Sequence, residues 1–130
     1  MRDDHALGRQ GEHLAAKVLK AKGYKILAQG HRQRLGEIDL VALDGPTVVF
    51  VEVKTRESDR QGDPADAVDR SKQEKLTRAA LIYLKRRNLL EQPCRFDVIS
   101  IVWPQLMKTE PDVRHIIHAF EAAGPYRMFH

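Results

Sequence analysis

Two stretches of the chain carry apolar residues at the three- and four-residue steps of an amphipathic helix. The first covers residues 4–22 and ends before Gly23, a residue type that commonly closes helices. The second begins at residues 71–74, where Ser-Lys-Gln-Glu matches a capping box, and ends near Arg87. The sequence therefore predicts one long helix at the start of the chain and one in its middle.

Shorter runs that alternate in polarity, or that are rich in β-branched residues, predict five strands. Residues 44–46, Asp-Gly-Pro, form a turn signal between the second and third runs, which indicates a β-hairpin. A polar, glycine-containing loop is expected after the third run, with Asp63-Pro64 capping a short turn. The five predicted strands are residues 24–28, 37–43, 47–56, 95–102 and 114–120.

The order of these elements predicts the class of fold. Two strands divided by a helix are the usual source of a parallel pair, whereas the hairpin is antiparallel. We therefore expect an α/β domain with a mixed sheet flanked by helices. At 130 residues the chain has the usual size of one domain, so residues 1–130 are predicted to form a single domain.

The hairpin places charged residues where they need an explanation. Glu52, Lys54 and Arg56 fall on one face of the third strand, because side chains alternate along a strand. A symmetric turn puts Asp39 directly opposite Glu52, with Cβ atoms about 5 Å apart. Two opposed carboxylates destabilise a sheet unless a proton or a cation lies between them.

A divalent metal ion would satisfy such a pair. Mg²⁺ or Mn²⁺ accepts hard oxygen ligands, and Mg²⁺ commonly takes one or two carboxylates beside substrate phosphate oxygens. Lys54 would then orient or help deprotonate an attacking water, or stabilise charge on the phosphate. The pattern predicts phosphodiester hydrolysis. The ordinary solvated face of an antiparallel sheet is the alternative, and for an isolated E-x-K it is the commoner one.

Several motifs together resemble the YraN-like family, an uncharacterised group assigned to the PD-(D/E)xK nuclease superfamily. The resemblance runs nearly end to end. It rests on residues 7–12 (Leu-Gly-Arg-Gln-Gly-Glu), 36–40 (Gly-Glu-Ile-Asp-Leu), 49–56 (Val-Phe-Val-Glu-Val-Lys-Thr-Arg) and 95–99 (Arg-Phe-Asp-Val-Ile).

This resemblance implies a restriction-endonuclease-like αβββαβ core, similar to that of archaeal-type Holliday-junction resolvases. It implies catalytic roles for Asp39, Glu52 and Lys54, an auxiliary acid at Glu12, and a metal ion held by Asp39, Glu52 and Val53. The implied substrate is DNA, including branched or single-stranded forms. Resolvase-like action on symmetric junctions would suggest a homodimer.

The charge of the chain is compatible with a nucleic-acid partner, since the net charge is +4. Arg56 shares the face of Lys54 and is the favoured phosphate contact, with Arg32 in a basic loop as a weaker candidate. Lys72 and Gln73 open the second helix, where backbone N–H groups suit a phosphate. An exposed first turn is the alternative for that pair.

Cellular location and other functions are constrained more loosely. Cys94 is the only cysteine, which fits a reducing cytoplasm, and neither a signal peptide nor a membrane span is expected. His115 and His118 should point to opposite faces of a strand and be structural. A nucleic-acid-binding module without turnover, or an interaction domain using a sheet edge or the Trp103 region, remain as alternatives.

Overall fold

The computed structural model describes residues 4–30, 35–56, 68–103 and 110–123. Seven elements follow one another in the predicted order of one helix, three strands, one helix and two strands. They are α1 (Asp4–Ala21), β1 (Lys25–Gln29), β2 (Leu40–Asp44), β3 (Thr47–Arg56), α2 (Arg70–Arg86), β4 (Cys94–Val102) and β5 (Asp112–Phe120).

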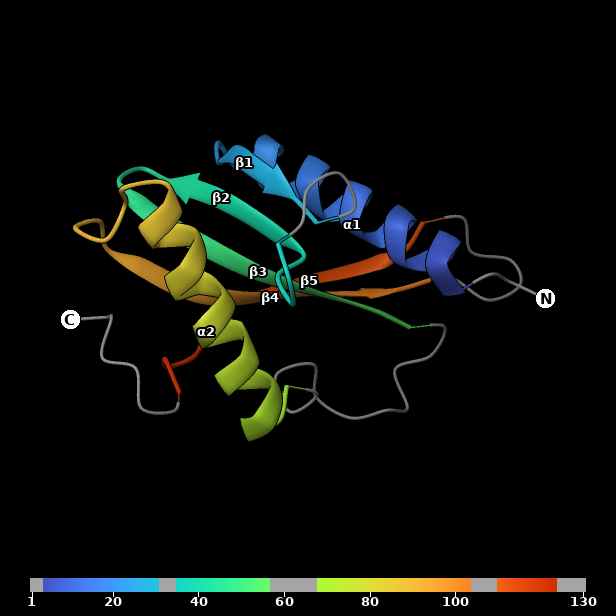
Figure 1. Ribbon diagram of the computed structural model, residues 1–130. Helices are drawn as coiled ribbons and strands as arrows, with labels where there is room; N and C mark the ends of the chain where they lie inside the picture. Colours follow the sequence, from blue (N-terminus) through green and yellow to red (C-terminus); the bar gives the residue numbers. More distant parts are fainter. Residues whose placement is uncertain (1–3, 31–34, 57–67, 104–109, 124–130) are drawn as a thin grey trace.

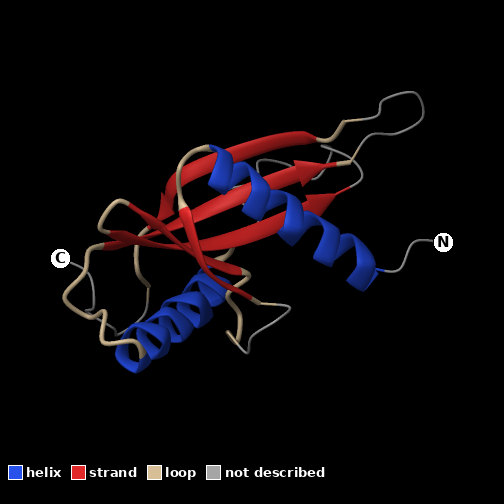
Figure 2. Ribbon diagram, turned by 90° about the horizontal axis from the view of Figure 1, so that it is seen from above, coloured by secondary structure: helices blue, strands red, loops and turns tan. Residues whose placement is uncertain are grey.

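All five strands form one mixed sheet in the order β1-β2-β3-β4-β5. β3 and β4 are parallel, and every other neighbouring pair is antiparallel. The two helices cover opposite faces of the sheet (Figures 1 and 2). The expected α/β fold with a mixed, helix-flanked sheet is confirmed, and the arrangement is consistent with a restriction-endonuclease-like core.

Alternation along β3 divides the hydrophobic core into two layers. Val49 and Val51 pack with residues of α1, together with the partly buried Val53. Val48 and Phe50 point to the other face and pack with residues of α2. The prediction that Val49, Val51 and Val53 lie on the face opposite to that of Glu52 is therefore confirmed.

The end of α1 shows why the glycine stop was predictable. Gly23 has a φ of 94°, a conformation that side chains with a Cβ rarely adopt. Its N–H donates to the Lys20 carbonyl at 2.9 Å, and the N–H of Tyr24 donates to the Leu19 carbonyl at 3.0 Å. These two bonds form a Schellman motif, which turns the chain into β1.

Two predicted boundaries were wrong. α2 is capped by Asp69, whose side chain accepts from the Lys72 N–H at 2.8 Å, so Ser71 lies within the helix and does not cap it. β2 begins at Leu40 and not at residue 37. The Ile38 N–H donates to the Leu35 carbonyl at 3.3 Å, which closes a turn before the strand. The predicted loop over residues 57–63 and the Asp63-Pro64 cap lie outside the described residues.

Candidate active site

Asp39 and Glu52 lie where β2 and β3 separate. The β2–β3 ladder has the predicted register, and its last pair at this end is Leu40 with Val51. The predicted pairing of Asp39 with Glu52 is not part of the ladder, because Asp39 directly precedes β2 and Glu52 follows Val51, the last residue of β3 that pairs with β2. The Asp39 carboxylate crosses to β3, where its Oδ2 accepts from the Val53 N–H at 2.8 Å. This bond holds the carboxylate at the edge where the ladder ends.

Both carboxyl groups are held in surroundings that disfavour their charged forms. Burial raises the pKa of Asp39 to about 6, the Val53 N–H opposes the rise, and the charge of Glu12 adds to it. Burial likewise raises the pKa of Glu52 to about 7, with the nearby charge of Asp39 as the second cause. The two groups thus repel each other's charge in a partly desolvated site.

Glu52 has an unsatisfied oxygen at this position. Its side chain is 11% exposed. Within the described part of the chain, its buried Oε2 has no hydrogen-bond donor. A buried polar atom without a partner costs free energy, so this oxygen is a position where a cation would be stabilising.

Lys72 and Glu37 form an ion pair beside the two carboxylates. Lys72 Nζ lies 2.7 Å from Glu37 Oε2 and 4.0 Å from Glu52 Oε1. Burial opposes the charge of the ammonium, but the hydrogen bond to Glu37 and the charge of Glu52 outweigh it and raise the pKa of Lys72. The hydrogen bond from Lys72 lowers the pKa of Glu37. The Lys72 ammonium, which was expected to contact phosphate, is therefore directed toward Glu37 and Glu52. These two residues and Asp39 form an acidic cluster.

Lys54 and Glu12 approach the same cluster from two elements. The charge of Lys54, on β3, opposes the rise in the pKa of Glu52. Glu12 is 8% exposed, so it is not the solvent-exposed helix residue that its position alone would suggest. α1 comes close to β3 here because Gly11 faces Thr55, where a Cβ on the glycine would overlap Cγ2 of the threonine. The absence of a side chain at Gly11 brings Glu12 toward the site.

The predicted nucleic-acid contacts have different surroundings. Arg56 is 5% exposed, which does not favour a direct phosphate contact from an open face. Gln73 Nε2 donates to the Val68 carbonyl at 2.9 Å and so fixes the entry into α2. Arg32 lies outside the described residues. These contacts stay predictions, as does the metal-binding role of Val53, whose N–H already binds Asp39.

The donor set fits a hard divalent cation that keeps most of its water ligands. In the described ranges, no group of three His, Cys, Asp or Glu residues could hold a metal ion. The candidate ligands are therefore the two carboxylates of Asp39 and Glu52. Mg²⁺ usually binds through one or two carboxylates, and the unsatisfied Glu52 oxygen and the raised pKa values indicate that positive charge would be stabilising here.

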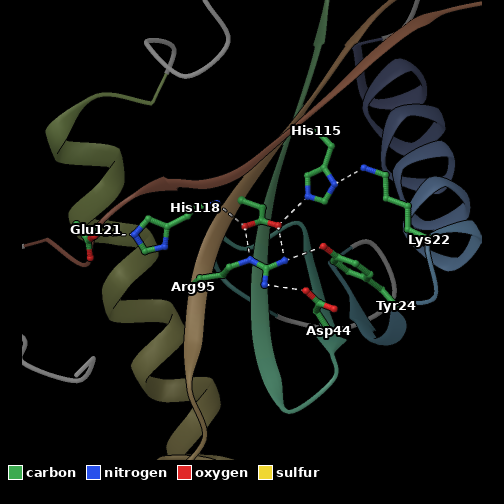
Figure 3. A network of polar contacts seen from close by, with 8 residues as sticks. Lys22, Tyr24, Asp44, Arg95, His115, His118 and Glu121 are labelled. Carbon is green, nitrogen blue, oxygen red and sulfur yellow. Dashed lines mark hydrogen bonds and ion pairs between the residues drawn. The ribbon is translucent and has the colours of Figure 1, made fainter.

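A second polar network joins β4 to its surroundings (Figure 3), and its central Asp97 pairs in register with Val51, the residue before Glu52. Asp97 is completely buried and accepts from Arg95 Nε at 3.0 Å, from His115 Nε2 at 2.7 Å and from the His118 N–H at 3.0 Å. Burial opposes its ionisation, but these bonds outweigh it and lower the pKa of Asp97. On the opposite side of its ring, His115 Nδ1 lies 2.8 Å from Lys22 Nζ. The network connects the turn after α1 with β4 and β5.

Sequence reasoning did not assign Glu37 or Asp97 a role. Glu37 lies two residues before Asp39 in the Gly-Glu-Ile-Asp motif, and this spacing was the available signal. Asp97 is an acid within an otherwise apolar strand, which indicates a buried and paired carboxylate. A further finding concerns the helices: in the part of the chain that the structure describes, neither is long and apolar enough to cross a membrane.

The fold and the site together define an α/β protein with a five-stranded mixed sheet and a pair of carboxylates at a strand divergence. Comparison with known sequences identifies the family. Residues 11–101 match the profile described as "Uncharacterised protein family UPF0102", and the chain belongs to that family. This agrees with the family membership expected from the sequence motifs.

Relatives from distant bacteria align with most of the chain. The UPF0102 protein RB9115 of Rhodopirellula baltica is 49% identical over 125 residues, covering 94% of this chain and 75% of the relative. A UPF0102 protein of Geotalea uraniireducens is 43% identical over 121 residues, covering 93% and 94%. The UPF0102 protein STH1475 of Symbiobacterium thermophilum is 50% identical over 95 residues, covering 73% and 80%.

Proposed function

We propose that this chain is a metal-dependent endonuclease of the PD-(D/E)xK type that hydrolyses phosphodiester bonds in DNA. The observation that supports it most is the convergence of Asp39 and Glu52, two largely buried carboxylates with raised pKa values and one oxygen for which the described residues offer no donor. Such an arrangement destabilises the fold unless a proton or a cation lies between the two groups, and two carboxylates suit Mg²⁺ or Mn²⁺. The main chain at Val53 is the expected additional ligand.

The chain's own side chains supply the remaining parts of such a site. When bound, the metal ion would polarise the phosphoryl group and acidify a bound water. The Val53 N–H fixes the direction of the Asp39 carboxylate. Lys54, close enough for its charge to oppose the rise in the pKa of Glu52, would orient the attacking water or stabilise charge on the phosphate. Glu12 would contribute a further acid from α1.

The charge of α2 supports a nucleic-acid substrate. Six of its seventeen residues are Lys or Arg and one is Glu, as the segment RSKQEKLTRAALIYLKR shows. Cations along one element attract the phosphate backbone without selecting a sequence. Branched or single-stranded DNA is the favoured substrate class because of the resolvase-like resemblance, and the homodimer that this class implies stays a prediction.

Cleavage of labelled duplex, single-stranded and four-way-junction DNA in Mg²⁺ or Mn²⁺ tests the proposal. We expect the parent to cut at least one of these substrates, and Glu52→Gln and Lys54→Ala to lose cleavage by about a hundredfold or more. Asp112→Asn is the matched control, because this carboxylate is exposed and lies on β5. DNA binding without any cleavage by the parent would contradict the enzyme and leave a non-catalytic binding module.

A further inference from the structure

A cavity of about 330 Å³ lies between α2 and residues 35–36, which directly precede Glu37. Ala79, Ile82 and Tyr83 line it from α2, and Leu35 and Gly36 line it from the opposite side. Ile82 is 42% exposed, which is unusual for a large apolar residue on a packed helix. The volume falls at the lower end of small-molecule sites, about 300 to 1,000 Å³, so the cavity has room for one nucleotide-sized group.

Two arginines at the end of α2 give the cavity a positive rim. Arg86 and Arg87 both line the cavity, and both are exposed. Among the described ion pairs neither guanidinium has a carboxylate partner. The Arg87 guanidinium carbon lies 5.4 Å from the centre of the Tyr83 ring, so a cation–π contact holds this guanidinium in place.

The cavity thus has apolar walls beside two guanidinium groups that pair with no carboxylate of the described residues. Such surroundings suit a ligand with a flat, weakly polar part and a negative charge. A nucleotide has both, because its base stacks on guanidinium planes and apolar side chains while its phosphate accepts from arginine. The position of the cavity connects it with the candidate active site. Gly36 is followed directly by Glu37, which pairs with Lys72 on α2.

The helix that lines the cavity also gives its distance from the acidic cluster. At about 1.5 Å per residue, Ala79 lies about 10 Å and Arg86 about 21 Å along α2 from Lys72. Lys75 and Arg78, both exposed, lie on the helix between Lys72 and the cavity. One strand with the spacing of duplex DNA, one phosphate per 3.4 Å of helix axis, would cover that span with about three to six nucleotides, and a more extended unpaired strand would need fewer.

We propose that this cavity binds one unpaired nucleotide of the nucleic-acid strand whose backbone is cut at Asp39 and Glu52. The inference rests on the proposed function, since a strand at the acidic cluster supplies the occupant. The base would lie against Ile82 and the Arg87 guanidinium, and its phosphate would face Arg86. The cavity would thereby select unpaired over fully paired DNA near the cut.

Binding of two fluorescein-labelled twelve-nucleotide strands in EDTA tests this directly. One strand is oligo-deoxythymidine and the other is its fully abasic counterpart, which keeps the phosphates and lacks the bases. We expect the parent to bind the thymidine strand about fivefold or more tightly than the abasic one, as one stacked base contributes. Arg86→Ala with Arg87→Ala, and separately Ile82→Glu, should reduce that ratio to near one.

Arg78→Ala with Lys85→Ala is the matched control, because these exposed cations lie on the same helix and do not line the cavity. The control should weaken both strands equally and keep the ratio. An equal ratio in all variants, or no preference for bases in the parent, would overturn the proposal. Competition by thymidine monophosphate as strong as that by the strand would also overturn it, in favour of a site for free nucleotides.

The two proposals can fail separately. If the parent cleaves DNA but shows no preference for bases in EDTA, the cavity proposal fails and the nuclease stands. If the parent cleaves nothing but the preference exists and is lost in the cavity variants, the nuclease proposal fails and the nucleotide site stands on a non-catalytic protein.

Discussion

Asp39→Asn separates the structural from the catalytic role of the acidic pair. The substitution removes one of two mutually repelling charges while nearly preserving shape. The amide oxygen of Asn can still accept from the Val53 N–H, which Asp39 binds at 2.8 Å. In metal-free buffer near neutral or higher pH, we therefore expect the variant to be more stable than the parent.

The size of the effect follows from the pKa of Asp39, raised from its ordinary 3.8 to about 6. A carboxyl group with a raised pKa binds its proton more tightly in the folded state than in the unfolded state. The free energy of unfolding therefore falls as pH rises from about 4 to about 6, by about 3 kcal/mol at most. Burying the neutral amide instead costs about 1 kcal/mol, so a net gain of about 1 to 2 kcal/mol is expected.

Urea denaturation in EDTA at about pH 5 and about pH 8 measures the gain in the free energy of unfolding. The gain should be smaller at about pH 5, because the Asp39 carboxyl group of the folded parent is then protonated and no longer repels Glu52, whereas in the unfolded chain it is still ionised. Millimolar Mg²⁺ or Mn²⁺ should then raise the melting temperature of the parent and not that of the variant. Asp112→Asn should respond to metal like the parent. A variant less stable than the parent in EDTA at both pH values, with a parent indifferent to metal, would refute the reasoning.

Three further predictions concern neighbouring features. Lys72→Met should lower the free energy of unfolding in EDTA above about pH 7 by about 1 kcal/mol, since the ammonium stabilises the charge of Glu52; an unchanged urea midpoint would contradict this. Asp97→Asn should cost about 3 to 5 kcal/mol in urea denaturation, because Arg95 loses a buried partner, and a loss below about 1 kcal/mol would refute it. DNA binding should weaken steeply with salt and depend little on sequence in fluorescence titrations, whereas salt-independent binding would favour an interaction domain.

The hairpin register could be predicted because its determinants are local. The turn at Gly45–Pro46 and the alternation of valines fix which residues face each other, and the observed pairs agree with both. The start of β2 could not be predicted in this way. It depends on a hydrogen bond from the Gly30 N–H to the Asp39 carbonyl, 2.7 Å long, and on the turn before Ile38. The alternation of polar and apolar residues within one strand does not predict such contacts between separate segments.

Burial of charged residues was also beyond local reasoning. The uninterrupted β3–β4 register from Glu52 to Arg56 keeps the two side chains on one face, as alternation predicted, but the low exposure of Arg56 depends on how the surrounding elements pack. Glu12 is buried because α1 approaches β3 closely at Gly11. The capping error at α2 has a different cause, since Asp69 and Ser71 are both acceptable caps and only one can begin the helix.

Comparing the two buried acidic positions shows which of them the fold leaves unsatisfied. Asp97 is the more deeply buried, yet its pKa is lowered, because Arg95, His115 and the His118 N–H all donate to it. The same sheet therefore can stabilise a buried carboxylate with its own donors. At Glu52 it does not, since one buried oxygen has no donor among the residues that the structure describes and the charge of Asp39 raises the pKa further. The cation proposed between Asp39 and Glu52 would supply the positive charge that Arg95 supplies to Asp97.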